Sequence, residues 1–377
     1  MASTTTTPPI AGAPQQGTPG MGTMPVTPTS APPVGAPLHG GSVPSGDENH
    51  KSLHHKGREK IPWGHEVWER IDQAVQQEMH RTRIGARFLP MRRVPPKTTS
   101  VPSDTFATTV VAGATPVLTV DEGATTRLNE FYVEFELTPQ QVQQETGDIR
   151  ELGHSTAVTL ATRAANVLAQ AEDLVVFQGQ NAITTANPFT SGSVLIQGAL
   201  ADSGLLNLPI GAAAAGPLTP AVTVVPVNPL RPAVPGVVYG PNTFEAVVQA
   251  YSELQALGHY GPYALVLETI PYADTYAPLP VTLIVTADRI RPLMTAGFFG
   301  TGTLPPNPPA PPAPPLVPPY YGVLVSLGGN TVDLVVGLDP IAAFMQEDLN
   351  GNFRFRVLER FALRVKDTTG IVVLQFN

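Results

Sequence analysis

Cysteine is absent from this 377-residue chain, and charged residues make up only 14% of it. The lack of cysteine excludes disulfide-stapled secreted domains, thiolate metal sites and cysteine nucleophiles. The charged fraction is well below the roughly one quarter that is usual in soluble proteins. Acidic residues outnumber basic ones, for a net charge of −8. That balance argues against a nucleic-acid partner, because nucleic-acid-binding proteins present a basic face.

Long apolar runs are missing as well. The longest weakly polar tract, residues 199–238, is interrupted by Asp, Asn, Arg and many prolines. A membrane-spanning helix needs about 20 consecutive apolar residues. The N-terminus has neither the basic nor the apolar segment of a secretory signal. These features predict a cytoplasmic protein that does not bind membranes.

Proline and glycine, in contrast, are abundant, with 42 and 34 residues, and they are clustered. Residues 1–46 contain ten prolines, eight glycines and no Asp, Glu, Lys or Arg. Such a segment buries too little apolar surface to offset the entropy of ordering it, so we predict that residues 1–58 form a disordered Pro/Gly/Thr-rich extension. Residues 305–319 hold ten prolines in 15 positions, a composition typical of polyproline II.

Two stretches have the pattern of long helices. In residues 63–80 an apolar stripe recurs every three or four residues, which predicts an amphipathic helix; the stripe is Trp68, Ile71, Val75 and Met79. Thr138, Pro139 and Gln141 form a capping-box signature that predicts the start of a spine helix ending near residues 177–179. A third amphipathic helix is expected over residues 244–257.

The remaining pattern is mostly that of strands. Alternation between residues 98 and 137 predicts a long β-hairpin or ribbon. Gly328, Gly329 and Asn330 predict a hairpin turn between two strands. Together these signals predict an α+β protein with two helix-and-sheet regions and a protruding ribbon; the further strands are expected at residues 263–268, 280–286, 322–327, 331–337, 353–358, 361–366 and 371–376.

Candidate catalytic and metal-binding residues are few. Ser155 follows His154 in a helical pattern, near Asp148 and Asp173, but the chain has no G-x-S-x-G nucleophile turn. We interpret His50, His54 and His55, which lie together in a polar stretch, as part of a hydrated hinge; that group is the alternative metal site. We therefore predict no catalytic, cofactor-binding or metal-binding residues and no enzymatic activity.

Two groups of charges also need partners. A basic cluster could bind phosphate, but we favour ion pairs with acidic strand residues such as Glu130, Glu134 and Glu136; its members are Arg81, Arg83, Arg87, Arg92 and Arg93. Glu172 and Asp173 lie where they oppose the dipole of the spine helix, which predicts a salt bridge to an arginine.

The order of motifs resembles that of the family 1 (linocin-like) encapsulin shell proteins, which share the Hong Kong 97-type fold of tailed-phage major capsid proteins. The matching stretches are IPWGHEVWERI from Ile61, ARF from Ala86, AEDLVVFQG from Ala171, GPYALVL from Gly261, GGNTVDLVVGLDPIAAF from Gly328 and LERFALRVKDTTGIVVL from Leu358. The long N-terminal extension and two proline-rich insertions depart from the family pattern.

The resemblance implies a capsid-type division of the chain. The expected parts are an N-terminal helix and arm (59–93), an extended β loop (94–137), a peripheral domain with the spine helix (138–190 and 341–377) and an axial domain (191–340) with proline-rich insertions at 199–236 and 303–319.

The resemblance also implies a function. The chain would assemble with copies of itself into an icosahedral nanocompartment in the cytoplasm and enclose a peroxidase or a ferritin-like iron oxidase, for oxidative-stress defence or iron storage. A short apolar C-terminal tail of the cargo would dock beside the N-terminal helix, and the candidate docking residues are Trp68, Ile71, Val75 and Met79. The alternative for this stripe is that it is packed core. The shell itself would need no cofactor.

Two other functions use the same residues differently. Because the fold is shared, the chain could be a tailed-phage or prophage major capsid protein that packages DNA. A protease or bacteriocin-like activity would depend on Ser155, and no motif supports it.

Overall fold

In the computed structural model, the structure describes residues 57–109, 117–146, 155–208, 222–231, 233, 236–278, 284–304 and 320–377. The predictions for residues 1–56, for the proline-rich run 305–319, for His154 and Asp148, and for most of the strand expected at 280–286 lie outside these ranges. Thr286, the last residue of that expected strand, is the first residue of a helix.

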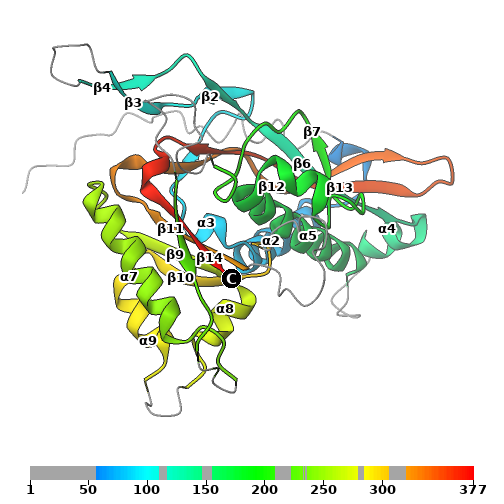
Figure 1. The fold of residues 1–377 in the computed structure, drawn as a ribbon. Coiled ribbons are helices and arrows are strands. Elements are labelled where there is room, and N and C mark those ends of the chain that lie inside the picture. The colour runs from blue at the N-terminus through cyan, green and yellow to red at the C-terminus, as the bar shows by residue number, and fades with distance from the viewer. Residues whose placement is uncertain are drawn as a thin grey trace, which may run out of the picture. The chain divides into compact units, whose positions relative to one another are not determined.

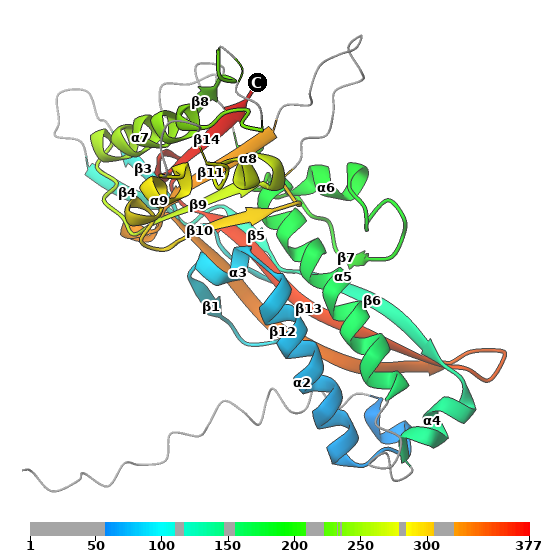
Figure 2. The same cartoon turned by 90° about the horizontal axis from the view of Figure 1, so that it is seen from below.

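The first of two five-stranded sheets runs in the order β1-β12-β13-β6-β7 (Figure 1). It is antiparallel except for the parallel pair β1–β12. Helices α2 and α5 lie side by side across it (Figure 2). Its strands are β1 (Met91–Arg93), β12 (Val332–Glu347), β13 (Phe353–Val365), β6 (Asn129–Leu137) and β7 (Leu195–Gln197).

The second sheet runs in the order β10-β9-β11-β14-β8, with α7 packed on β8, β14 and β11. Parallel pairs at both edges flank an antiparallel centre. Its strands are β10 (Gly297–Thr301), β9 (Tyr263–Glu268), β11 (Tyr320–Ser326), β14 (Ile371–Phe376) and β8 (Thr223–Val227).

Four short strands form two antiparallel ribbons between β1 and β6. They are β2 (Ser100–Pro102) paired with β5 (Thr125–Arg127), and β3 (Thr105–Thr109) paired with β4 (Val117–Asp121). The ribbon predicted between residues 98 and 137 is therefore confirmed in its antiparallel pairing. Its last strand, β6, instead joins the first sheet.

Helices connect and cover these sheets. The remaining elements are η1 (Arg58–Lys60), α2 (His65–Thr82), α3 (Gly85–Phe88), α4 (Pro139–Thr146), α5 (Thr156–Gln178), α6 (Gln180–Thr185), α7 (Pro241–Ala256), α8 (Thr269–Asp274), α9 (Thr286–Ile290), η4 (Arg291–Leu293), η5 (Gly328–Asn330) and η6 (Thr368–Gly370). Helix α5 is the C-terminal part of the predicted spine, and it ends at Gly179, whose φ is +59°. The predicted start at Thr138 and Pro139 belongs to a separate helix, α4, because Ser155 has an extended backbone and caps a new helix through the Val158 N–H. A Cβ on Gly179 would lie 2.2 Å from the backbone oxygen of Asp202, so only glycine fits there.

Strand pairing differs from prediction in three places. Gly328–Asn330 is a turn, but β11 before it and β12 after it belong to different sheets, so it is not a hairpin. The two strands expected at 353–358 and 361–366 are one continuous strand, β13. The predicted boundary at residue 341 also falls inside β12, and β14, which is expected in the peripheral domain, pairs with β11 and β8 in the second sheet. Strand β14 is apolar on both faces, so it suits a sheet that is covered on both sides.

Candidate functional site

The apolar stripe of α2 is core rather than surface. Its four residues expose 4%, 1%, 0% and 0% of their surface (Trp68, Ile71, Val75 and Met79). They belong to the main hydrophobic cluster, where α2 packs against α5 and β12. The four candidate docking residues therefore bury their side chains inside the protein, and Ile71, Val75 and Met79 present no surface to a cargo tail.

An open cavity of about 370 Å³ lies at the start of the same helix. It is lined by Arg58, Glu59, Trp63, His65 and Trp68. Trp68 is thus the single predicted docking residue that reaches it. The cavity combines two indole rings with one acidic and two basic or titratable side chains, so it could hold an apolar segment and pair with charges at its rim.

Ring stacking, a hydrogen bond and an ion pair fix the side chains of the cavity wall. The Trp63 ring stacks on Phe355 with centroids 5.1 Å apart, and its Nε1 donates a 3.0 Å hydrogen bond to the Val142 carbonyl oxygen. The Arg58 guanidinium lies 4.4 Å above the Trp68 ring and pairs with Asp72 at 2.7 Å. These contacts join η1, α2, α4 and β13 around the opening.

Sequence reasoning missed Trp63 and Arg58 as parts of a site. Trp63 lies just before the helical stripe, and Arg58 is at the end of a stretch interpreted as a polar hinge. A usable signal was present, because the only two tryptophans of the chain are both here.

Four of the five arginines in the basic cluster pair with acids other than the expected strand acids, and Arg87 lies over the Phe299 ring. Arg81 pairs with Glu78, Arg83 with Glu172 and Arg93 with Asp339, at 2.7, 3.4 and 3.3 Å. Glu130, Glu134 and Glu136 instead face arginines of the neighbouring strand β13, namely Arg354, Arg356 and Arg360. The expectation failed because cross-strand register decides which side chains meet.

A buried acidic group lies where α5 meets the first sheet. Arg83 pairs with Glu172, which confirms the predicted salt bridge, and the carboxylate of Asp173 accepts hydrogen bonds from the backbone N–H groups of Ile84 and Gly85. Burial raises the pKa of Asp173 to about 7, and the neighbouring Glu172 adds to the shift. Burial and the Glu172 carboxyl also raise the pKa of Glu359 on β13 well above its usual range.

Glu359 was not singled out from the sequence, although a signal existed. Strand β13 alternates, and Glu359 takes a position in the register of Phe355, Val357 and Phe361, whose side chains face the core. A charged residue in an apolar register points to a buried partner, which here is Glu172.

Ser155 has a structural role in the helix. Its Oγ accepts the Val158 N–H at 3.1 Å as the N-cap of α5 and donates to Glu145 at 2.7 Å. Asp173 is occupied by the backbone of α3, 18 residues along the chain from Ser155. Within the part of the chain that the structure describes, no group of three or more His, Asp or Glu side chains is arranged to hold a metal ion. In the same part, no helix is both long and apolar enough to span a bilayer.

Comparison with known proteins decides the family. The family described as "Encapsulating protein for peroxidase" (Linocin_M18) matches residues 54–186 and 233–362. The chain belongs to this family. The matched ranges include α2, the ribbons, the spine helix and most of both sheets, so the predicted membership among linocin-like encapsulin shell proteins is confirmed.

Individual relatives agree with the family assignment. The chain is similar to the type 1 encapsulin shell protein EncA of Myxococcus xanthus (strain DK1622), at 26% identity over 328 residues that cover 85% of this chain and 96% of the relative. Its fold is similar to that of the virus-like particle from Pyrococcus furiosus, with a TM-score of 0.52 and 16% identity over 81% of this chain and 98% of that one. This likeness supports the predicted α+β capsid fold.

Proposed function

We propose that this encapsulin-family chain is a subunit of a closed icosahedral shell in the cytoplasm, and that the shell encloses a cargo enzyme. The family match over most of the folded chain carries the proposal. The role is structural, and we expect the chain itself to have no catalytic activity, cofactor or metal.

The ribbons support assembly on physical grounds. Strands β3 and β4 pair with each other and form a sheet of only two strands. A two-stranded unit is marginally stable by itself in water. Additional packing from a neighbouring copy would stabilise this ribbon, and contacts of that head-to-tail kind close into rings and shells.

The cavity at the start of α2 is the proposed docking site for the cargo. The family description names a peroxidase as the enclosed protein, and the cargo proposed here is a peroxidase that carries a short apolar C-terminal tail. The indole rings of Trp63 and Trp68 would cover the apolar part of the tail. The exposed His65 side chain at the rim would pair with a carboxylate when protonated, while the buried Arg58 stays paired with Asp72.

Assembly is tested by size-exclusion chromatography and electron microscopy of the purified full chain. Uniform hollow particles are expected. A compact monomer in dilute buffer would refute the shell. Particles filled with DNA would instead support the tailed-phage capsid alternative.

Docking is tested by co-expressing the shell with a fluorescent protein that carries a short synthetic apolar C-terminal tail, and by measuring fluorescence per particle. His65→Trp fills the cavity and should reduce loading about tenfold, which corresponds to about 1.4 kcal/mol. Gln73→Trp adds the same ring at an exposed position about two turns further along α2, outside the cavity lining, and should leave loading unchanged. Equal loading of both variants would show that the tail binds elsewhere.

A further inference from the structure

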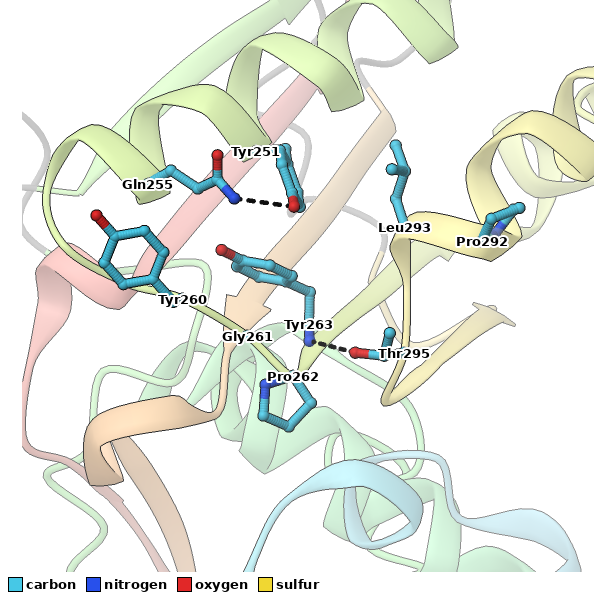
Figure 3. Close-up of a pocket in the computed structure, with 9 residues that line it drawn as sticks. All are labelled: Tyr251, Gln255, Tyr260, Gly261, Pro262, Tyr263, Pro292, Leu293 and Thr295. Carbon is cyan, nitrogen blue, oxygen red and sulfur yellow. Dashed lines mark hydrogen bonds between the residues drawn. The ribbon is translucent and has the colours of Figure 1, made fainter. Parts of the chain in front are cut away.

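A second cavity, of about 340 Å³, opens at one end of the second sheet (Figure 3). Tyrosine side chains dominate it. Tyr251 and Tyr263 lie with ring centroids 4.8 Å apart, and Tyr260 is 70% exposed. All nine lining residues are uncharged, and Pro262 and Leu293 add further apolar surface. The cavity therefore suits an uncharged ligand that packs against aromatic faces.

The cavity also offers hydrogen-bond donors. Tyr251 Oη accepts a 2.9 Å hydrogen bond from Gln255 Nε2, which leaves the hydroxyl proton of Tyr251 free to donate (Figure 3). The hydroxyl of Tyr260 lies on the exposed side. Proline has no N–H, and the carbonyl groups of a polyproline II helix make no internal hydrogen bonds. Aromatic faces combined with donors are the surface that recognises such helices.

The chain contains a segment of matching chemistry. Residues 305–315 read PPNPPAPPAPP, with two prolines in every three positions. Because polyproline II has three residues per turn, Asn307, Ala310 and Ala313 fall on one edge and the prolines form the other two. The whole stretch 305–319 carries no charge, like the cavity. Residues 1–46 are also rich in proline, but their prolines follow no such three-residue repeat.

The residues that flank this segment lie at one end of the second sheet, and the cavity of the same copy lies at the other end. Before the segment, Thr301 pairs with Glu268, the last residue of β9. After it, Tyr320 pairs with Phe376 and lies two residues before Gly322, which pairs with Leu267 near the same end of β9. The cavity lies at Tyr263, the first residue of β9. Leu304, just before the segment, is fully buried. The five intervals of β9 span about 17 Å.

Fifteen residues of polyproline II extend about 46 Å. Travel to the cavity and back uses about 34 Å of that length. The remaining 12 Å or so would have to supply both the chain reversal and the docked residues. The segment is therefore too short to fill the cavity of its own copy.

We propose that the tyrosine-lined cavity binds residues 305–319 of a second copy of the chain as a polyproline II helix. The contact links neighbouring subunits through the second sheet. The proposal rests on the proposed shell, in which neighbouring copies are held close together.

Disulfide trapping tests the contact in assembled particles, because the natural chain has no cysteine. A chain carrying Pro292→Cys on the cavity rim and Ala310→Cys in the segment should give a ladder of linked subunits on a non-reducing gel. The control pairs Ala310→Cys with Leu349→Cys, which is fully exposed on the turn between β12 and β13, and should remain monomeric. A fast-migrating, internally linked monomer, or intact particles without any link, would overturn the proposal.

Peptide binding identifies the occupant. The receptor is the full chain with residues 305–319 replaced by a Gly/Ser segment of equal length, and the probe is a labelled synthetic peptide of residues 304–320, followed by fluorescence anisotropy. Tyr260→Ala should weaken binding at least about tenfold. Val248→Ala, an exposed change on α7, the helix that carries the cavity residue Tyr251, should not. Tighter binding of a peptide of residues 1–46 would overturn the choice of occupant.

Electron microscopy of every variant separates the two ideas. Absence of particles in a preparation of the natural chain would count against the shell itself. Normal particles that lack both the disulfide ladder and peptide binding would count against this contact alone.

Discussion

The two five-stranded sheets bury their residues in different ways. In the second sheet, alternate residues of β9, β11 and β14 enter the main hydrophobic cluster on one face and a second apolar cluster under α7 on the other. In the first sheet, one face of β13 packs on α2 and α5, while the other carries a row of arginines; these are Arg354, Arg356, Arg360 and Arg364. The outer face of the first sheet therefore combines charge pairing across strands with two small apolar clusters, around Leu358 and Ala362, whereas the second sheet packs apolar residues on both faces.

The largest effects are expected when a charge is placed on adjacent residues of one strand, because this tests separately whether each face of the sheet is buried. Val323→Lys and Leu324→Lys point to opposite faces of β11 and should both prevent folding, because each buries an unpaired ammonium at a cost of several kcal/mol. In β13, Phe355→Lys should be equally severe, whereas Arg354→Leu should cost less than about 1 kcal/mol because its ion pairs are half exposed. The yield of soluble particles and urea unfolding measure the effects. Unequal results for the two β11 variants would contradict burial on both faces.

Removal of a buried arginine tests the charged face. Arg364 is 2% exposed and pairs with Asp333 at 2.6 Å, and the Arg364 and Lys366 side chains hold the pKa of Asp333 below its usual value, although burial opposes them. Arg364→Leu should lower the free energy of unfolding by about 3 kcal/mol, at the lower end for a broken buried pair, because Lys366 still neutralises Asp333. Urea denaturation gives the value. A loss as small as that of Arg354→Leu would mean that the row of arginines on β13 contributes little to stability.

The buried acids at α5 make stability depend on pH. Asp173, with a pKa raised from 3.8 to about 7, stays protonated in the folded state where the unfolded chain has ionised. The folded state therefore binds more protons between about pH 4 and about pH 7, and stability falls as pH rises through that window. Glu359, whose pKa is also raised, acts in the same direction.

The variant that isolates this effect is Glu359→Gln, which keeps a hydrogen-bond donor toward Glu172 but no longer titrates. It should reduce the slope of the free energy of unfolding against pH by up to about 1.4 kcal/mol per pH unit. Urea midpoints measured across the same window provide the comparison. A slope identical to that of the natural chain would show that the carboxyl pair is not protonated when folded.

The smallest effect concerns the cap of the spine helix. Ser155→Ala removes an N-cap and should destabilise the protein by about 1 kcal/mol, as other caps do. Thr159→Ala, an exposed change one turn later, should cost less. Thermal melting of particles records both. Loss of a hydrolytic activity in Ser155→Ala alone would revive the protease interpretation.

Much of the local structure followed from residue patterns. The α2 helix, the capped start at Pro139, and strands β9 and β14 agree with prediction, because each depends on spacing within one segment. Strand partners did not follow, since β11 and β12 are consecutive yet enter different sheets. What covers the α2 stripe did not follow for the same reason: a stripe shows that a face is covered, but not whether the cover is α5 or another protein.

Periodicity and capping chemistry are properties of neighbouring residues, so the amino-acid sequence alone was enough to predict helices, the ribbon and the family. Pairings such as Glu172 with Glu359, 187 positions apart, and the cavities beside Trp63 and Tyr263, came into view only once distant segments were packed together. Burial, charge pairing and the shape of an opening depend on what lies across the core, and no local pattern records that.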